Sequence, residues 1–254
     1  MWKPSPRPLI YPDHWALIDI SEDAKLRSRM LQVLQRGTLL FSSMNLMETA
    51  RTKGADLENI ATFLDEVGDR WAPISLNTTE VRLRERTGML EPWRDEELLR
   101  WVRDAPGVGG KLSQLVRRGQ EPWAAEANKL WEQGEAAKIG AMIADGREAF
   151  RKGTLKFGSL PAVHGVLDTK ALSNGVLQNY VCGNLNLKRN QIDDLFHTIV
   201  PVSHAEVVFL DGPTKRNLLK GLNTRAKVFW KGEIEAAFQY LETFSSEEGA
   251  SLPP

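Results

Sequence analysis

The sequence predicts an α/β protein, namely a three-layer α/β/α sandwich with a central, mostly parallel sheet and a largely helical insertion. Short apolar runs alternate along the chain with longer segments whose apolar residues recur at helical spacing. This alternation is typical of a parallel sheet that is covered by helices on both faces. The stretch 87–183 differs in character, since it carries four of the eight tryptophans and long helical patterns, and we expect it to be the insertion.

Residues 1–86 are expected to form the first part of the sandwich. Apolar runs predict three strands, at residues 9–11, 38–41 and 72–75. Capping residues and apolar spacing predict helices that begin near residues 21–23, at 42 or 43, at 57, and near 78 or 79. Pro12 stops the first strand, and Gly37 ends the helix before the second strand.

Residues 184–254 are expected to complete the same sheet, so that the α/β core is discontinuous in sequence. The predicted strands are 206–210 and 226–230, and the predicted helices are 192–200, 213–222 and 233–244. Within the insertion 87–183, helices are expected from Pro122 to about Lys152 and from 171 to 181. Its tryptophans are expected to pack in a hydrophobic core rather than to bind a ligand.

The composition is ordinary for a globular protein, with 42% apolar and 26% charged residues in a chain of 254. A single cysteine, Cys182, excludes an internal disulfide and fits a reducing compartment. The first residues lack the apolar core of a signal peptide, and no run approaches the roughly 18 apolar residues of a membrane helix. We therefore expect a cytoplasmic protein with no membrane contact.

Charge is unevenly distributed, although the formal net charge is zero. Between residues 184 and 231, eight basic residues stand against four acidic residues, a local excess of +4. Cations around a small acidic centre are typical of phosphate-binding surfaces, although a solvated helical face explains the same pattern more simply. The basic residues are Lys188, Arg189, Lys215, Arg216, Lys220, Arg225, Lys227 and Lys231.

Four carboxylates occupy positions from which they can meet at one edge of the sheet. Asp13 and Asp211 each follow an expected strand, and Glu48 lies early in the helix after the second strand. Asp194 shares a helical face with His197. Ligands of parallel sheets gather at the carboxyl ends of the strands. Carboxylates held together there need cations, which predicts a Mg²⁺ or Mn²⁺ site for phosphodiester chemistry.

The same residues resemble the PIN-like nuclease family. The similar segments are Tyr11–Ala16, Thr38–Glu48, Asp194–His197 and Val207–Asp211. The family pattern has an acid after the first strand, then a Ser-x-x-(Thr/Asn)-x-x-Glu helix start after the second. A late helix acid follows, and then an acid after the next strand. The matching acids, in order along the chain, are Asp13, Glu48, Asp194 and Asp211.

The resemblance implies a metal-dependent endoribonuclease that acts on single-stranded or structured RNA. It also implies a prokaryotic toxin or defence nuclease that is restrained by an inhibitor or antitoxin protein, and an oligomer is compatible with it. The four matching acids would be both catalytic residues and metal ligands, and Lys215 and Arg216 would hold phosphate. The resemblance covers the outer parts of the chain, whereas 87–183 has no counterpart in a minimal member of the family.

Several polar residues keep alternative interpretations. Asp193 adjoins Asp194, but the spacing of three residues between Asp194 and His197 matches the family pattern and favours Asp194 as ligand. His197 is expected to be the partner of a carboxylate or a buried, satisfied histidine. Asn45 either binds a metal-bound water or phosphate, or caps a helix. Asp19 is expected in a loop, as the cap of the following helix.

Two other functions compete with the nuclease. A catalytically silent PIN-like module would bind RNA or protein without cleaving. Its main support is Pro12, because a proline in a strand requires that the strand end there or lie at a sheet edge. A metal phosphatase is disfavoured, since no Asp-x-Asp pair follows the first strand.

Overall fold

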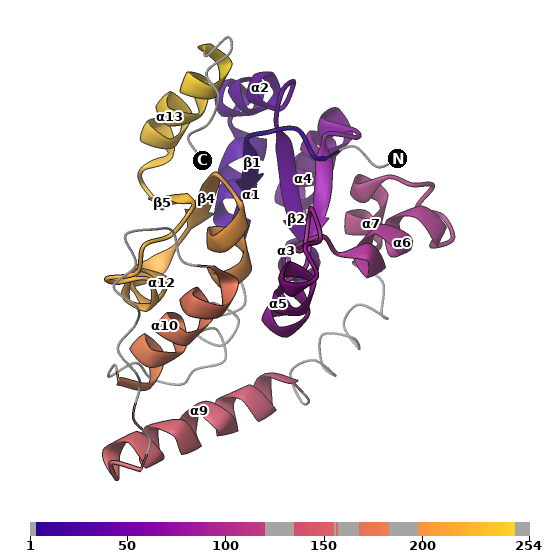
Figure 1. The fold of residues 1–254 in the computed structure, drawn as a ribbon. Coiled ribbons are helices and arrows are strands. Elements are labelled where there is room, and N and C mark those ends of the chain that lie inside the picture. Colours follow the sequence, from indigo (N-terminus) through magenta and orange to yellow (C-terminus); the bar gives the residue numbers. More distant parts are fainter. Residues whose placement is uncertain (1–3, 120–134, 155, 157–167, 183–197, 247–254) are drawn as a thin grey trace.

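A five-stranded, all-parallel sheet forms the centre of the protein (Figure 1). The computed structural model describes residues 4–119, 135–154, 156, 168–182 and 198–246. The strand order is β3-β2-β1-β4-β5, so that β1 lies at the centre of the sheet. All five expected strands are present, and the α/β class with a parallel sheet is confirmed. The strands are β1 (Leu9–Tyr11), β2 (Thr38–Ser42), β3 (Trp71–Ile74), β4 (Val207–Leu210) and β5 (Lys227–Trp230).

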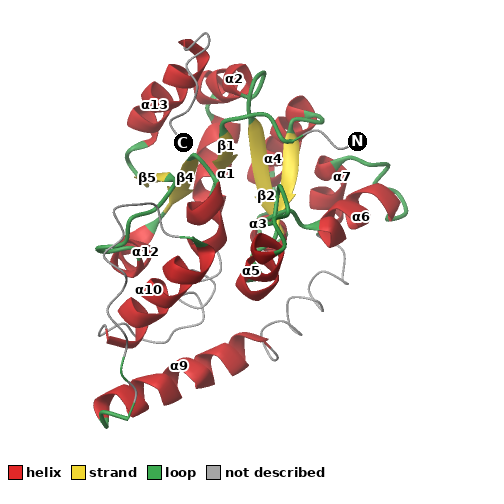
Figure 2. Ribbon diagram, viewed as in Figure 1, coloured by secondary structure: helices red, strands yellow, loops and turns green. Residues whose placement is uncertain are grey.

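Two helical layers cover the sheet (Figure 2). Successive side chains of a strand point to opposite faces, so that Ile10 and Phe209 join one core while Tyr11 and Leu210 join the other. The first face is covered by α1 (His14–Glu22), α2 (Ala24–Val33), α4 (Ala55–Val67) and α13 (Ile234–Ser246). The second face is covered by α5 (Thr78–Arg86), α10 (Thr169–Cys182), the helical residues 198–204 and α12 (Gly212–Leu218).

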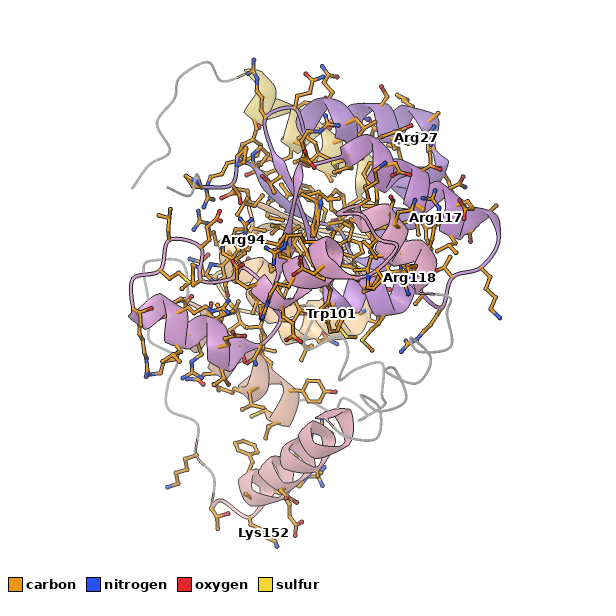
Figure 3. All side chains as sticks on the ribbon, turned by 90° about the vertical axis from the view of Figure 1, so that its right-hand side faces the viewer. Arg27, Arg94, Trp101, Arg117, Arg118 and Lys152 are labelled. Atoms are coloured by element: carbon orange, nitrogen blue, oxygen red, sulfur yellow. The ribbon has the colours of Figure 1, made fainter. Side chains whose placement is uncertain are left out.

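The expected insertion is helical where it is described. Helices α6 (Glu96–Asp104) and α7 (Leu112–Arg118) add Leu98 and Leu115 to the first core. Arg117, labelled on α7 in Figure 3, pairs with Glu58 and Asp65 of α4. The long helix expected from Pro122 to about Lys152 is described from Glu135 on, as α9 (Glu135–Arg151), which contacts α10 and lies away from the sheet (Figure 1). Residues 120–134 lie outside the described part.

Two local expectations are wrong. Of the tryptophans expected in a core, Trp93 is buried but Trp101 of α6 is 46% exposed, and Trp123 and Trp131 lie outside the described residues. Asp19 lies inside α1 instead of in a loop, and Asp23 rather than Asp19 caps the following helix, α2. The carboxylate of Asp23 accepts hydrogen bonds from the amides of Lys25 and Leu26. The sequence concealed α1 because its apolar residues form a nearly continuous run rather than a helical period, and because Asp23 both ends α1 and begins α2. In the described part of the chain, no helix is long and apolar enough to cross a membrane.

A polar network closes the amino edge of the sheet. Glu206, just before β4, accepts hydrogen bonds from the Leu9 amide at 2.7 Å and from Arg225 at 3.1 Å, and it also pairs with Arg7. His204 Nε2 lies 2.9 Å from Thr169 Oγ1. Although Glu85 Oε1 is also only 3.2 Å from this nitrogen, burial, together with Arg225 and Arg7, lowers the pKa of His204 to about 4.

Protonation of His204 is expected to destabilise the protein as the pH falls from about 6.5 to about 4. The folded pKa of about 4 lies below the ordinary 6.5, so that the unfolded chain binds an additional proton in this window. The full cost below pH 4 is about 3 kcal/mol, since one pKa unit corresponds to about 1.4 kcal/mol. In urea unfolding at a series of pH values, His204→Gln should therefore lose less stability than the wild type. Parallel pH profiles for the two proteins would contradict this expectation.

Candidate functional site

The candidate site lies where neighbouring strands send the chain to opposite faces of the sheet. After β1 the chain enters α1 on the first face, and after β4 it enters α12 on the second face. Such a switch point at the carboxyl ends of the strands is the usual ligand position in open α/β sheets. Asp13 is the N-cap residue of α1, and Asp211 is the N-cap residue of α12. The two acids therefore flank the switch point.

Pro12 ends the central strand without interrupting its attachment to the neighbouring strands. β1 ends at Tyr11, and the next free amide, that of Asp13, donates to the Phe209 carbonyl of β4 at 3.2 Å. On the other side, the Pro12 carbonyl accepts a hydrogen bond from Asn45 Nδ2 at 3.0 Å. Of the two possibilities that the proline left open, the strand ends there and does not lie at a sheet edge.

A buried lysine joins the two acids. The ammonium group of Lys215, on α12, donates to Asp13 Oδ2 and lies 3.0 Å from Asp211 Oδ1. The side chains of Lys215 and Asp13 are each only 4% exposed, whereas that of Asp211 is 49% exposed. Gly212 makes the turn between β4 and α12 with a φ of +73°, a conformation that residues with side chains rarely adopt. The side of the site formed by Asp13 and Lys215 is thus buried, whereas the side formed by Asp211 is open to solvent.

Glu48 approaches the same edge from β2. It lies on α3 (Ser43–Thr49), it is half-buried, and its Oε2 atom is shielded from solvent. The hydroxyl group of Tyr11 is fully buried and lies 3.1 Å from Ser42 Oγ. Burial, reinforced by the negative charges of Asp13 and Glu48, raises the pKa of Tyr11 well above its usual range. Tyr11 therefore stays neutral, between the acid that follows β1 and the acid that follows β2.

Asn45 holds the turn that carries Glu48 against the turn that carries Asp13. Ser42 and Asn45 form a capping box, in which Asn45 Oδ1 accepts from the Ser42 amide at 2.9 Å and the Asn45 amide donates to Ser42 Oγ at 3.1 Å. Because Asn45 Nδ2 also binds the Pro12 carbonyl, one fully buried side chain links the ends of β1 and β2. The sequence allows Asn45 to bind a metal-bound water or phosphate, or to cap a helix. In the structure it forms the helix cap.

His14, next to Asp13, is a neutral neighbour of the site. Its Nε2 atom lies 2.9 Å from Thr52 Oγ1. Burial lowers the pKa of His14 from its ordinary value, and Asp13 opposes this shift. No motif in the sequence assigns a role to His14 or to Tyr11. Two adjacent buried strands each end in a residue with a hydroxyl group, Tyr11 and Ser42. This feature of the sequence could have predicted the contact between the two hydroxyl groups.

The two cations expected to hold phosphate differ in position. Lys215 is turned inward onto the carboxylates, as its i,i+4 spacing from Asp211 permits. Arg216 is on the surface, with its side chain 60% exposed and its guanidinium 4.8 Å from the centre of the Trp230 ring. It also lies 3.8 Å from Glu233. In this arrangement only Arg216 is open to a phosphate from solvent.

The residues expected to complete the metal site lie outside the described part of the chain. These are Asp193, Asp194 and His197. Within the described residues, no three carboxylate, imidazole or thiol groups are placed to hold a metal ion together. In the part of the chain that the structure describes, Asp13 and Asp211 do converge, and both contact the same cation. Their oxygens are the hard ligands that Mg²⁺ and Mn²⁺ prefer, so the donor chemistry fits such an ion in place of the ammonium group.

Comparison of the chain with protein-family models, with curated proteins and with solved structures gives no significant match. The carboxylates and the lysine at the switch point are therefore the features that bear on function.

Proposed function

We propose that this protein is a metal-dependent endoribonuclease of the PIN-like class, which hydrolyses phosphodiester bonds with Mg²⁺ or Mn²⁺. The observation that carries the proposal is the convergence of Asp13 and Asp211 on one cation at the switch point of the sheet. Burying a carboxylate such as Asp13 costs free energy that an apolar residue would not cost. Because the buried charge of Asp13 costs free energy and lies at the usual ligand position, it favours a functional role for this residue over a purely structural one.

The strand order supports the same proposal. Because β1 lies between β2 and β4, the acids that follow these three strands reach the same edge of the sheet. These acids are Asp13, Glu48 and Asp211, which we propose as metal ligands and catalytic residues together with Asp194. Metal sites for phosphoryl chemistry are commonly built in this way, from carboxylates on separate elements.

Each group would have a defined task in hydrolysis. A bound Mg²⁺ or Mn²⁺ ion would supply an activated water and stabilise charge on the leaving oxygen. Asp13 is held in place by its backbone bond to β4, and Glu48 by the capping box of α3. Arg216 presents its guanidinium at the surface, where it can bind a phosphate oxygen of the substrate. RNA as substrate, the toxin or defence role and an inhibitor protein as partner follow from the resemblance alone and are proposed on that basis.

Asp13→Asn and Asp211→Asn are each expected to reduce RNA cleavage in Mg²⁺ or Mn²⁺ by about 100-fold or more. Loss of a metal ligand removes several kcal/mol of transition-state stabilisation, and each 1.4 kcal/mol is about tenfold in rate. Cleavage of a labelled single-stranded RNA, and of a DNA of the same sequence, measures the effect. Folding of each variant is verified by circular dichroism at the assay temperature.

The matched control is Asp69→Asn, the same change at an exposed acid just before β3, on the opposite edge of the sheet. It should cleave at the wild-type rate. Undiminished cleavage by both site variants would remove Asp13 and Asp211 from the mechanism.

A catalytically silent module is the second candidate, and Lys215 is the observation that favours it. An ammonium group between the two acids neutralises them without a metal ion. A silent module would bind RNA or protein at this edge and would show no cleavage with either ion. RNA binding by the wild type in the absence of cleavage would therefore favour this function over the nuclease.

A further inference from the structure

Lys215 occupies the position between Asp13 and Asp211 that a bound metal ion would take. We propose that Lys215 is a built-in counter-cation of this site, and that a divalent metal binds there only by displacing its ammonium group. The inference rests on the proposed metal site and concerns how that site is regulated. It predicts that the lysine and the metal exclude each other.

The contacts show that this is more than a surface ion pair. An i,i+4 pair such as Lys215 and Asp211 usually lies on the outside of one helix and is exposed to water. Here the lysine also reaches Asp13, which is 202 residues away in sequence and belongs to the connection on the other face of the sheet. Both Lys215 and Asp13 are buried, and each charge is tolerated there because the other compensates it.

Charge and distance make the two cations mutually exclusive. The ammonium nitrogen lies 3.0 Å from Asp211 Oδ1 and also contacts Asp13. A Mg²⁺ ion that bound the same two carboxylates at about 2.1 Å would stand within van der Waals contact of this nitrogen. Two like charges so close repel strongly in a poorly solvated site. The carboxylates can therefore hold the lysine or the metal, but not both.

The displaced side chain has an exit toward solvent. Asp211 is half-exposed, so that the site opens on the side of α12, where Lys215 is rooted. The flexible four-carbon stem of lysine lets the ammonium group turn outward while it stays tethered beside the metal. There it meets the phosphate of an incoming substrate, which is the role that the sequence predicts for Lys215. Metal binding would thus convert an internal counter-ion into a phosphate-binding group.

The test compares Mn²⁺ affinity in the wild type and in Lys215→Met, measured by calorimetry without substrate. Removal of the competing cation is expected to lower the dissociation constant by at least about tenfold. Lys220→Met, at an exposed lysine beyond α12, is the matched control and should bind Mn²⁺ like the wild type. Equal or weaker binding by Lys215→Met would overturn the proposal.

A second measurement uses the wild-type protein, in case Lys215→Met does not fold. Amine acetylation followed by peptide mapping reports how accessible each lysine is. Lys215 should react slowly without metal and several-fold faster with saturating Mn²⁺, whereas Lys220 should react equally in both. A Lys215 rate that Mn²⁺ does not change would overturn displacement.

These outcomes can be separated from those of the nuclease assay. Tighter Mn²⁺ binding by Lys215→Met in a protein that cleaves no RNA would sustain the counter-cation role and reject the nuclease. Metal-dependent cleavage by the wild type, with no gain in Mn²⁺ affinity in Lys215→Met, would support the nuclease and reject the counter-cation role.

Discussion

Lys215→Met is expected to lower the free energy of unfolding by about 3–5 kcal/mol in metal-free buffer, the usual cost of breaking a buried ion pair from one side. The variant leaves the buried carboxylate of Asp13 without the ammonium group that it contacts. Asp211 contributes less to this cost, because its half-exposed carboxylate is solvated by water. Urea unfolding followed by circular dichroism measures the loss.

A double-mutant cycle provides the control for this prediction. Asp13→Asn alone removes the buried one of the two carboxylates that Lys215 contacts in the described part of the chain, and it should also be costly. The double variant Asp13→Asn/Lys215→Met removes both members of the buried pair, and it should therefore be more stable than the sum of the two single losses predicts. Strictly additive losses would show that the two side chains do not stabilise each other. Asp211→Asn should cost about 1 kcal/mol or less.

Phe209→Ala is expected to lower the free energy of unfolding by about 3–5 kcal/mol, the range for removing a buried aromatic ring. Phe209 is fully buried at the centre of the first core, where its ring packs edge-on against Trp15 with centroids 6.1 Å apart and lies 6.4 Å from the ring of Phe229. Its carbonyl accepts the hydrogen bond from the Asp13 amide, so that the same residue supports the core and the site. Urea unfolding measures the change in stability.

Leu83→Ala serves as the control for Phe209→Ala. Leu83 is 62% exposed on α5, and its truncation should change stability by no more than about 0.5 kcal/mol. Phe209→Leu retains most of the apolar volume and should lose clearly less than Phe209→Ala. A loss below about 1 kcal/mol for Phe209→Ala would contradict the central place of this ring in the core.

The strands could be predicted from the sequence because each is a short, buried apolar run with a clear stop. Thr38–Ser42 is buried throughout and ends at Ser42, which caps the next helix, and Val207–Leu210 is buried and is followed by Asp211 and Gly212. Helix α1 could not be predicted in this way. Its apolar residues form a nearly continuous run that hides the helical period, and it meets α2 at a single shared residue, Asp23.

The positions of Asp13 and Asp211 after two strands follow from local sequence, and so does the prediction that both reach one edge of a parallel sheet. Their closeness depends on strand order, because β1 and β4 are neighbours although almost two hundred residues separate them. The direction of Lys215 depends on packing as well. The charge pattern marks this residue only as one of several cations, whereas the buried pairing with Asp13 arises because α12 returns across the end of β1. The secondary structure of a segment depends largely on neighbouring residues and can be predicted from the sequence. A contact between charges that are distant in the sequence forms only when the sheet brings their elements together.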